Sequence, residues 1–260
     1  MKRLIYAEWR VLVQRNSARS LLAISVVIPV LTAMILRSVS ESEMVLNDQS
    51  ITEILSFSGP HTANLSLRVR HALILPIFLL FVTGSSFATE RENRMLRERL
   101  VRPVSRDSLL LAKLTTLLML STISLMINAL VALPLGSLLM GIDGPWSLTA
   151  IGHTASLLSD LGIISLGVLL STICRSGAMV VVSGILIYLF DQALNAGLFL
   201  VGLAGVDGTK WIQEILPSTG WNTWTVILGE NGWVSGVNLL VWTSMFLMVA
   251  RHRLNRQDIP

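Results

Sequence analysis

Long apolar stretches alternate with short polar ones along the whole chain. A bilayer hydrocarbon core of about 30 Å needs about 20 consecutive apolar residues to be crossed by a helix. Stretches of this kind cover residues 20–36, 71–88, 111–135, 148–174, 178–201 and 233–250. The pattern predicts an all-α integral membrane protein, with one domain over residues 1–260 and six transmembrane helices.

Residues 1–19 predict a helix that lies in the membrane interface. Its polar side carries Glu8, Arg10 and Arg15. Its apolar stripe consists of Leu4, Ile5, Trp9, Leu12 and Val13. A basic start followed by apolar residues also fits a secretory signal peptide, but the apolar run is longer than the usual 7–15 residues. An uncleaved first span is therefore favoured.

Tryptophans collect around the last predicted outer segment, residues 202–232. Tryptophan is enriched at membrane–water interfaces, so this segment is predicted to be interfacial or re-entrant, with a short helix from Trp211 that stops before Pro217. The helix either anchors the neighbouring spans or gates the exit of a pathway. Trp146 lies in the other outer turn, so five of the seven tryptophans collect at one predicted membrane face: Trp146, Trp211, Trp221, Trp224 and Trp233.

Composition and charge agree with a membrane protein and set its orientation. Charged residues make up only 14% of the chain, hydrophobic residues 52%, and the mean hydropathy is +0.67; soluble domains have about 25% charged residues. If both termini are cytosolic, 16 of the 20 Lys and Arg residues lie in cytosolic segments, as the positive-inside rule requires. The pI of 9.8 therefore reflects topology and not nucleic-acid binding.

Several kinds of enzyme site are absent from the sequence. There is no phosphate-binding GxxxxGK[ST] loop, no HExxH zinc motif and no GxSxG nucleophile motif. The single cysteine, Cys174, excludes a cysteine zinc site within the chain. We therefore expect no bound cofactor, no metal and no catalytic residue. The four histidines lie in four different segments: His61, His71, His153 and His252.

Polar residues inside the predicted spans are candidates for a transport pathway. Ionisable groups inside a membrane are costly, so they usually face a cavity or a partner. Two aspartates, Asp160 and Asp191, lie inside predicted spans, and no Lys or Arg is predicted deep enough in a span to pair with them. Each is therefore expected to be protonated, hydrated or hydrogen-bonded to Ser, Thr or Asn. Polar contacts that merely hold helices together are an equally good explanation. The candidates are Asn128, His153, Asp160, Asp191 and Asn195.

Residues 89–106, between the second and third spans, form a charged cytosolic segment. Residues 89–100 are strong helix formers, and Pro103 would end that helix. Ser105 is placed to cap the third span, with Asp107 in its first turn. A basic loop bound to anionic lipid is the alternative, but mixed charge around an apolar stripe favours a groove on a partner protein.

The charged segment resembles one found in permease subunits of ABC-2 type transporters. Residues 90–113 read ERE, then LRERLVRPVSR, then LLLAK, and the tail reads RLNRQDI over residues 253–259. Asn93 and Arg94 stand where that family often has Gly-Thr. The six spans and the basic N-terminal helix fit the family as well.

The resemblance implies that residues 89–99 form a coupling helix, seated on a separate ATP-binding cassette subunit. It further implies a dimer of permeases with two such subunits, which hold the ATP and Mg²⁺, in a bacterial inner membrane with membrane lipid around it. The residues it assigns to partner contact are Glu90, Arg91, Glu92, Arg94, Met95, Leu96, Arg97 and Glu98.

Two other functions remain compatible with the sequence. An ion- or proton-coupled secondary transporter would use Asp160 and Asp191, although the two halves of the chain lack the similarity that inverted repeats would give. A noncatalytic scaffold for the maturation of an extracytoplasmic protein is the second alternative. The cargo of an exporter is left open among drugs, peptides, lipid-linked glycans, haem and ions.

Overall fold

The computed structural model describes residues 1–40, 58–93, 105–144, 146–203, 208–218 and 232–256. The described part of the chain is helical and contains no strand, which confirms the predicted fold class. Its elements are α1 (Lys2–Gln14), α2 (Asn16–Ser40), α5 (Gly59–Val69), the π-helical turn η1 (Arg70–Ile74), α6 (Leu75–Glu92), α8 (Arg106–Met140), α9 (Trp146–Ile173), α10 (Gly177–Leu203), α11 (Thr209–Ile215) and α14 (Gly232–Arg256).

Six helices among the described residues are long and apolar enough to cross a membrane, as predicted. Helix α9 is central: it contacts α5, α6, α8, α10 and α14. In α9, 72% of the apolar window is buried, against 28–56% in the other five spans. The fourth span, α9, packs against both the third, α8, and the fifth, α10, but α10 packs mainly on α6 and α14 mainly on α9.

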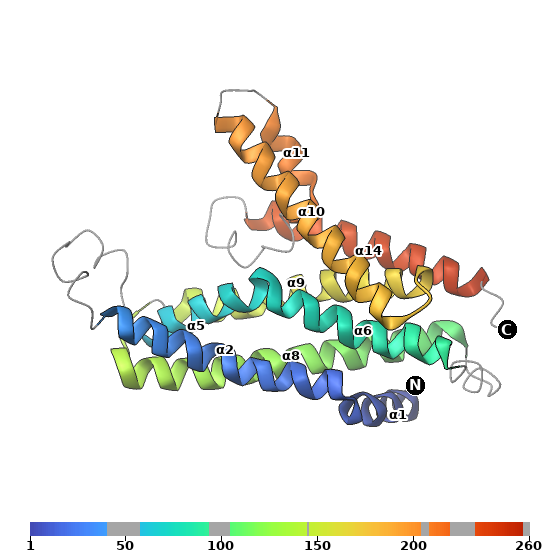
Figure 1. Ribbon diagram of the computed structural model, residues 1–260, viewed down its shortest axis with the longest axis horizontal. Helices are drawn as coiled ribbons and strands as arrows, with labels where there is room; N and C mark the ends of the chain where they lie inside the picture. Colours follow the sequence, from blue (N-terminus) through green and yellow to red (C-terminus); the bar gives the residue numbers. More distant parts are fainter. Residues whose placement is uncertain (41–57, 94–104, 145, 204–207, 219–231, 257–260) are drawn as a thin grey trace.

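The two ends of the helix bundle differ in what they carry (Figure 1). The N-terminus, the last turn of α6 and the last turn of α14 lie at one end, which we call the base. Helix α8 begins at the base, and α2 ends at the opposite end of the bundle. The C-terminal half of α10 projects away from the bundle together with α11, which occupies the place of the short helix predicted near Trp211.

The second span is longer than predicted. Instead of residues 71–88 it covers Gly59–Glu92, 34 residues, because α5, η1 and α6 form one continuous helix. At 1.5 Å per residue it is roughly 50 Å long, well beyond a hydrocarbon core of about 30 Å. Arg68 and Arg70, which precede the predicted span at residues 71–88, therefore lie inside this helix.

The local signals that predicted the start of α8 are confirmed. The Ser105 hydroxyl accepts a hydrogen bond from the Ser108 backbone N–H at 3.2 Å, and Asp107 lies in the first turn of α8. Helix α8 ends at Met140, and the next residue, Gly141, has φ +97°, a positive backbone angle that favours glycine. The cap and the glycine fix the bounds of α8, which carries residues of both charge clusters described below.

Close approach of α5 and α8 requires glycine. A Cβ atom added to Gly136 would lie 2.7 Å from the Cβ of Thr62 and 3.0 Å from the Cα of Gly59. We expect Gly136→Ala to lower the free energy of unfolding by about 1–3 kcal/mol, since the helices must separate to admit a methyl group.

Gly197→Ala is the matched control for this prediction. It lies within α10 and has no neighbouring atom within 4 Å of an added Cβ. Because alanine is the better helix former, this change should be neutral or stabilising by about 0.5–1 kcal/mol. Unfolding in mixed detergent micelles measures both variants, and equal effects would contradict the packing argument.

Candidate functional site

A buried charge cluster, the base cluster, joins three helices at the base of the bundle. The Nζ of Lys113 lies 2.9 Å from Oε2 of Glu8 and 2.8 Å from Oε2 of Glu90, and it donates to the carbonyl oxygen of Ser86 at 2.8 Å. Arg15 pairs with the other oxygen of Glu90. The lysine ammonium has three donors, and the three acceptors satisfy all of them.

The base cluster is shielded from solvent and links helices far apart in sequence. The side chains of Lys113, Glu8 and Glu90 are 2%, 6% and 2% exposed. Glu8 belongs to α1, Glu90 to α6 and Lys113 to α8, with Arg15 at the junction of α1 and α2. Removing one member of such a cluster leaves a buried charge uncompensated, which is strongly unfavourable.

Sequence reasoning missed most of this cluster. Glu8 was assigned to the polar side of the N-terminal helix, yet Glu8 and Leu12 are the buried residues of α1. A usable signal was present: Lys113 lies inside the third apolar stretch, where a lone charge requires a partner.

The residues predicted to contact a partner protein fall into two groups. Glu90 and Arg91 bind groups of this chain, Arg91 through the carbonyl oxygens of Thr172 and Cys174. Glu92 is exposed at the end of α6. Residues 89–92 thus form the last turn of the second span, so no separate helix begins at residue 89. The other predicted residues lie outside the described part of the chain: Arg94, Met95, Leu96, Arg97 and Glu98.

A second buried cluster, the Asp160 cluster, lies near the middle of α9. Oδ2 of Asp160 pairs with Nη2 of Arg70 at 3.1 Å, and Oδ1 lies 3.1 Å from Nε2 of His71. The Ser121 hydroxyl donates to the same carboxylate. The side chains of Asp160, Arg70 and His71 are at most 2% exposed.

The expectation that no Lys or Arg would reach an aspartate is therefore wrong for Asp160. Arg70 lies within the second span, where the π-helical turn brings it and the adjacent His71 to one carboxylate. The Tyr188 hydroxyl of α10 contacts the carbonyl oxygens of His71 and Ala72 at 3.0 and 3.1 Å. Such turns interrupt the usual backbone pairing and often occur at functional sites.

Polar contacts continue from the Asp160 cluster towards α2. Nη2 of Arg70 donates to the Ser124 hydroxyl at 3.3 Å, and Ser124 lies 2.6 Å from the Ser25 hydroxyl. Asn128, a predicted candidate, is fully buried nearby on α8 and accepts from Ser66 at 3.0 Å. Nε and Nη1 of Arg70 and Nδ2 of Asn128 have no hydrogen-bond partner among the described residues.

The remaining predicted pathway residues do not join the Asp160 cluster. His153 contacts the carbonyl oxygen of Thr149 on its own helix at 2.8 Å. Nδ2 of Asn195 donates to Ser218 at 2.9 Å, and Asp191, one turn earlier, is 7% exposed and also lies against Ser218. Asp191 and Asn195 thus connect α10 to the segment after α11, apart from the Asp160 cluster. The five candidates do not form one polar pathway.

Motif residue Arg106 connects α8 to α14. Its Nη1 donates to the carbonyl oxygens of Leu254 and Asn255 at 2.7 and 3.0 Å. The next residue, Asp107, forms an exposed ion pair with Arg251, at 2.6 Å between Oδ2 and Nη2. Among the described residues, no group of three or more His, Cys, Asp or Glu side chains could hold a metal ion.

This architecture defines a multi-pass, all-helical membrane protein with charges buried between its spans. A family model described as ABC-2 family transporter protein matches residues 4–192, and the chain belongs to this family. The matched region contains both charge clusters, and it confirms the resemblance that residues 90–113 suggested. The chain matches no curated protein.

Proposed function

We propose that this chain is the permease subunit of an ATP-driven ABC exporter. Two copies form the translocation pathway, and each is coupled to a separate ATP-binding cassette subunit through residues 89–106. The observation that carries the proposal is the ion pair of Glu90 with Lys113. These residues are the two ends of the family motif, and they join the helices on either side of the charged segment.

The base cluster suits the transmission of force from a partner. The charged segment leaves from the end of α6 and returns at the start of α8. Because Lys113 holds Glu90 and Glu8 together, a displacement of the segment moves α6, α8 and α1 as one unit. The movement then reaches the spans through α6, which packs against α9 and α10.

The partner supplies the energy. No phosphate-binding loop occurs in this sequence, so ATP and Mg²⁺ bind to the cassette subunit. The distribution of Lys and Arg orients the base of the bundle, with both termini, towards the cytosol of a bacterial inner membrane. The position of the N-terminus and of the last turns of α6 and α14 at one end of the bundle supports that orientation.

The Asp160 cluster argues against the secondary-transporter alternative. An ion-coupling carboxylate must release and bind its ion during transport, whereas Asp160 is held by Arg70, His71 and Ser121. The cluster therefore suits a polar connection between spans. Asp191, the other aspartate, contacts the segment after α11 and not a pathway through the bundle.

Charge reversal in the charged segment tests the coupling proposal. We expect the double change Arg94→Glu and Arg97→Glu to abolish co-purification of an ATP-binding cassette subunit from detergent-solubilised membranes. The reason is that the segment would lose charge complementarity with the groove of the cassette subunit. The readout is the amount of partner recovered per permease, measured by quantitative mass spectrometry.

Arg3→Glu is the matched control, since it reverses an exposed charge on α1. It should leave partner recovery unchanged. If the double variant recovers as much cassette subunit as the native chain, coupling through this segment is refuted. If transport is lost while partner recovery is unchanged, the result would indicate either the noncatalytic scaffold function or a defect in a step that follows partner binding.

A further inference from the structure

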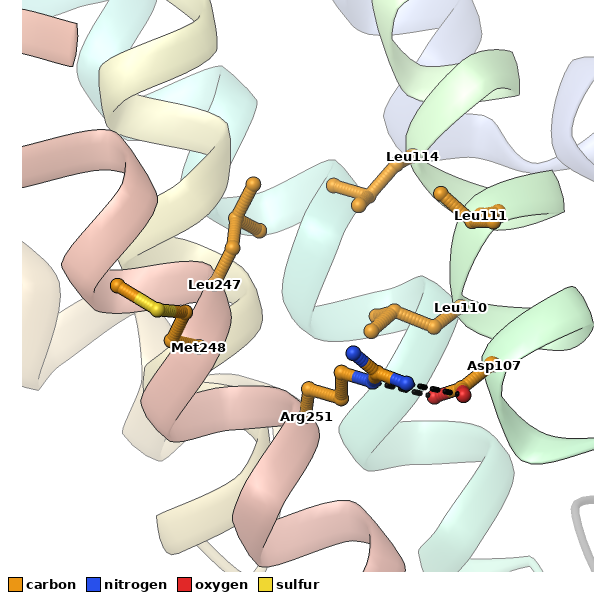
Figure 2. Close-up of a pocket in the computed structure, with 7 residues that line it drawn as sticks. All are labelled: Asp107, Leu110, Leu111, Leu114, Leu247, Met248 and Arg251. Atoms are coloured by element: carbon orange, nitrogen blue, oxygen red, sulfur yellow. Dashed lines mark hydrogen bonds and ion pairs between the residues drawn. The ribbon is translucent and has the colours of Figure 1, made fainter.

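A narrow apolar groove separates α8 from α14 near the base of the bundle (Figure 2). Its volume is about 310 Å³. Leu110 and Leu114 of α8 are buried along the groove. Leu111 and Met248, at its rim, are 53% and 65% exposed. Leu247 of α14 completes the apolar lining. The groove is thus open along a side where the spans face the membrane.

One end of the groove is closed by an ion pair that leaves part of its arginine free. In Figure 2, Arg251 reaches from α14 across to Asp107 on α8. Nε and Nη2 of Arg251 donate to the two carboxylate oxygens at 2.8 and 2.6 Å. Nη1 donates no hydrogen bond within the described structure, and the side chain is 61% exposed. An arginine fork so placed can bind a phosphate oxygen with its free edge.

The surroundings of the free arginine edge are basic. A second hollow of about 280 Å³ adjoins the groove and is lined by Met248, Arg251, His252 and Asn255. Arg253 and Arg256 are exposed on the same last turns of α14. Among the described residues that line the two hollows, Asp107 is the one acidic side chain, and Arg251 already neutralises it. The hollow therefore favours a negatively charged group.

The charged residues lie nearer the base and the apolar lining lies deeper in the bundle, in the same order as the headgroup and acyl chains of a phospholipid. Asp107 and Arg251 lie nearest the helix ends at the base, and the apolar residues lie towards the bundle middle on both helices. From Asp107 to Leu114 the groove runs for roughly 10 Å at 1.5 Å per residue. A headgroup at the arginine would place its acyl chain along the leucines.

We propose that this groove binds one anionic phospholipid of the surrounding membrane. Its phosphate accepts hydrogen bonds from Nη1 of Arg251 beside His252, and one acyl chain lies between α8 and α14. The bound lipid would fill the gap where these helices contact each other little. This inference goes beyond the transport proposal and requires only that the chain spans a membrane.

Native mass spectrometry of the detergent-purified protein tests this proposal. The protein is mixed with palmitoyl-oleoyl phosphatidylglycerol or with the zwitterionic phosphatidylcholine of the same chains. We expect one phosphatidylglycerol per chain to be retained, and at least tenfold less phosphatidylcholine. Arg251→Gln should lower phosphatidylglycerol retention at least tenfold, whereas Asp107→Asn should keep or increase it because the arginine becomes free.

The opposite effects of Arg251→Gln and Asp107→Asn separate lipid binding from a purely structural ion pair, which both changes break. Equal effects of the two variants, or equal retention of the two lipids, would overturn the proposal.

Leu111→Trp tests the acyl-chain part independently, because the indole would occupy the mouth of the groove. It should reduce retention of phosphatidylglycerol at least tenfold. Leu138→Trp, at an 82% exposed position near the other end of the same helix, is the matched control and should change nothing. If Leu111→Trp instead converts dimers to monomers without changing lipid retention, a second copy of the chain occupies the groove and the proposal fails.

Discussion

Replacing Asp160 with alanine is expected to destabilise the protein by about 3–5 kcal/mol, because Arg70 would remain buried with an uncompensated charge. Arg70 is 1% exposed and has no other acidic partner among the described residues. The loss should appear as a lower midpoint of unfolding in mixed micelles and as a lower yield of monodisperse protein.

The double variant Asp160→Ala with Arg70→Met provides the control. If the loss arises from the orphaned charge, removing the arginine as well should restore most of the stability, since buried ion pairs are often replaceable by apolar residues. An Asp160→Ala protein as stable as the native chain would contradict the ion pair. If the double variant loses more unfolding free energy than the two single variants added together, the interactions of His71 and Ser121 depend on both charges.

Replacing Lys113 with methionine should be similarly damaging, by about 3–5 kcal/mol, because the carboxylates of Glu8 and Glu90 would remain buried without their shared cation. Arg15 compensates only one of them. Transport should also be lost, since α1, α6 and α8 would no longer move together. Unfolding in micelles measures the first effect, and cargo export by reconstituted vesicles measures the second.

Two companion variants make this prediction specific. Adding Glu8→Gln to Lys113→Met removes one orphaned carboxylate, and it should recover part of the stability but not the transport. Arg251→Gln breaks an ion pair that is exposed, 61% and 42% for its two side chains, and should cost far less. If Lys113→Met costs no more than Arg251→Gln, the base cluster is not a buried ion-pair network.

Local sequence signals predicted the elements of this fold well. Span positions follow from apolar run length, and the start of α8 follows from Ser105 and Asp107, whose cap needs only neighbouring residues. The short helix that begins near Trp211 was also found in this way. Each of these features depends on residues within a few positions of one another.

The second span shows where such signals fail. Hydropathy counts Arg70 as a break, because it assigns the full cost of a charge to one residue. In the folded chain Asp160, 90 residues away, shares that cost, so the helix continues through the arginine to Gly59. The same effect concealed Glu8, whose partner Lys113 is 105 residues distant.

By itself, the sequence determined that this protein is a six-span helical membrane protein and which segment resembles the coupling region of ABC-2 permeases, and the distribution of its charges predicts an orientation. Only the tertiary structure decided that Glu90 lies in a buried cluster, that Asp160 pairs with Arg70, and that Asp191 belongs to another part of the molecule. The physical reason is distance along the chain. Apolar length and helix capping are local properties, whereas compensation of a buried charge depends on which helices pack together.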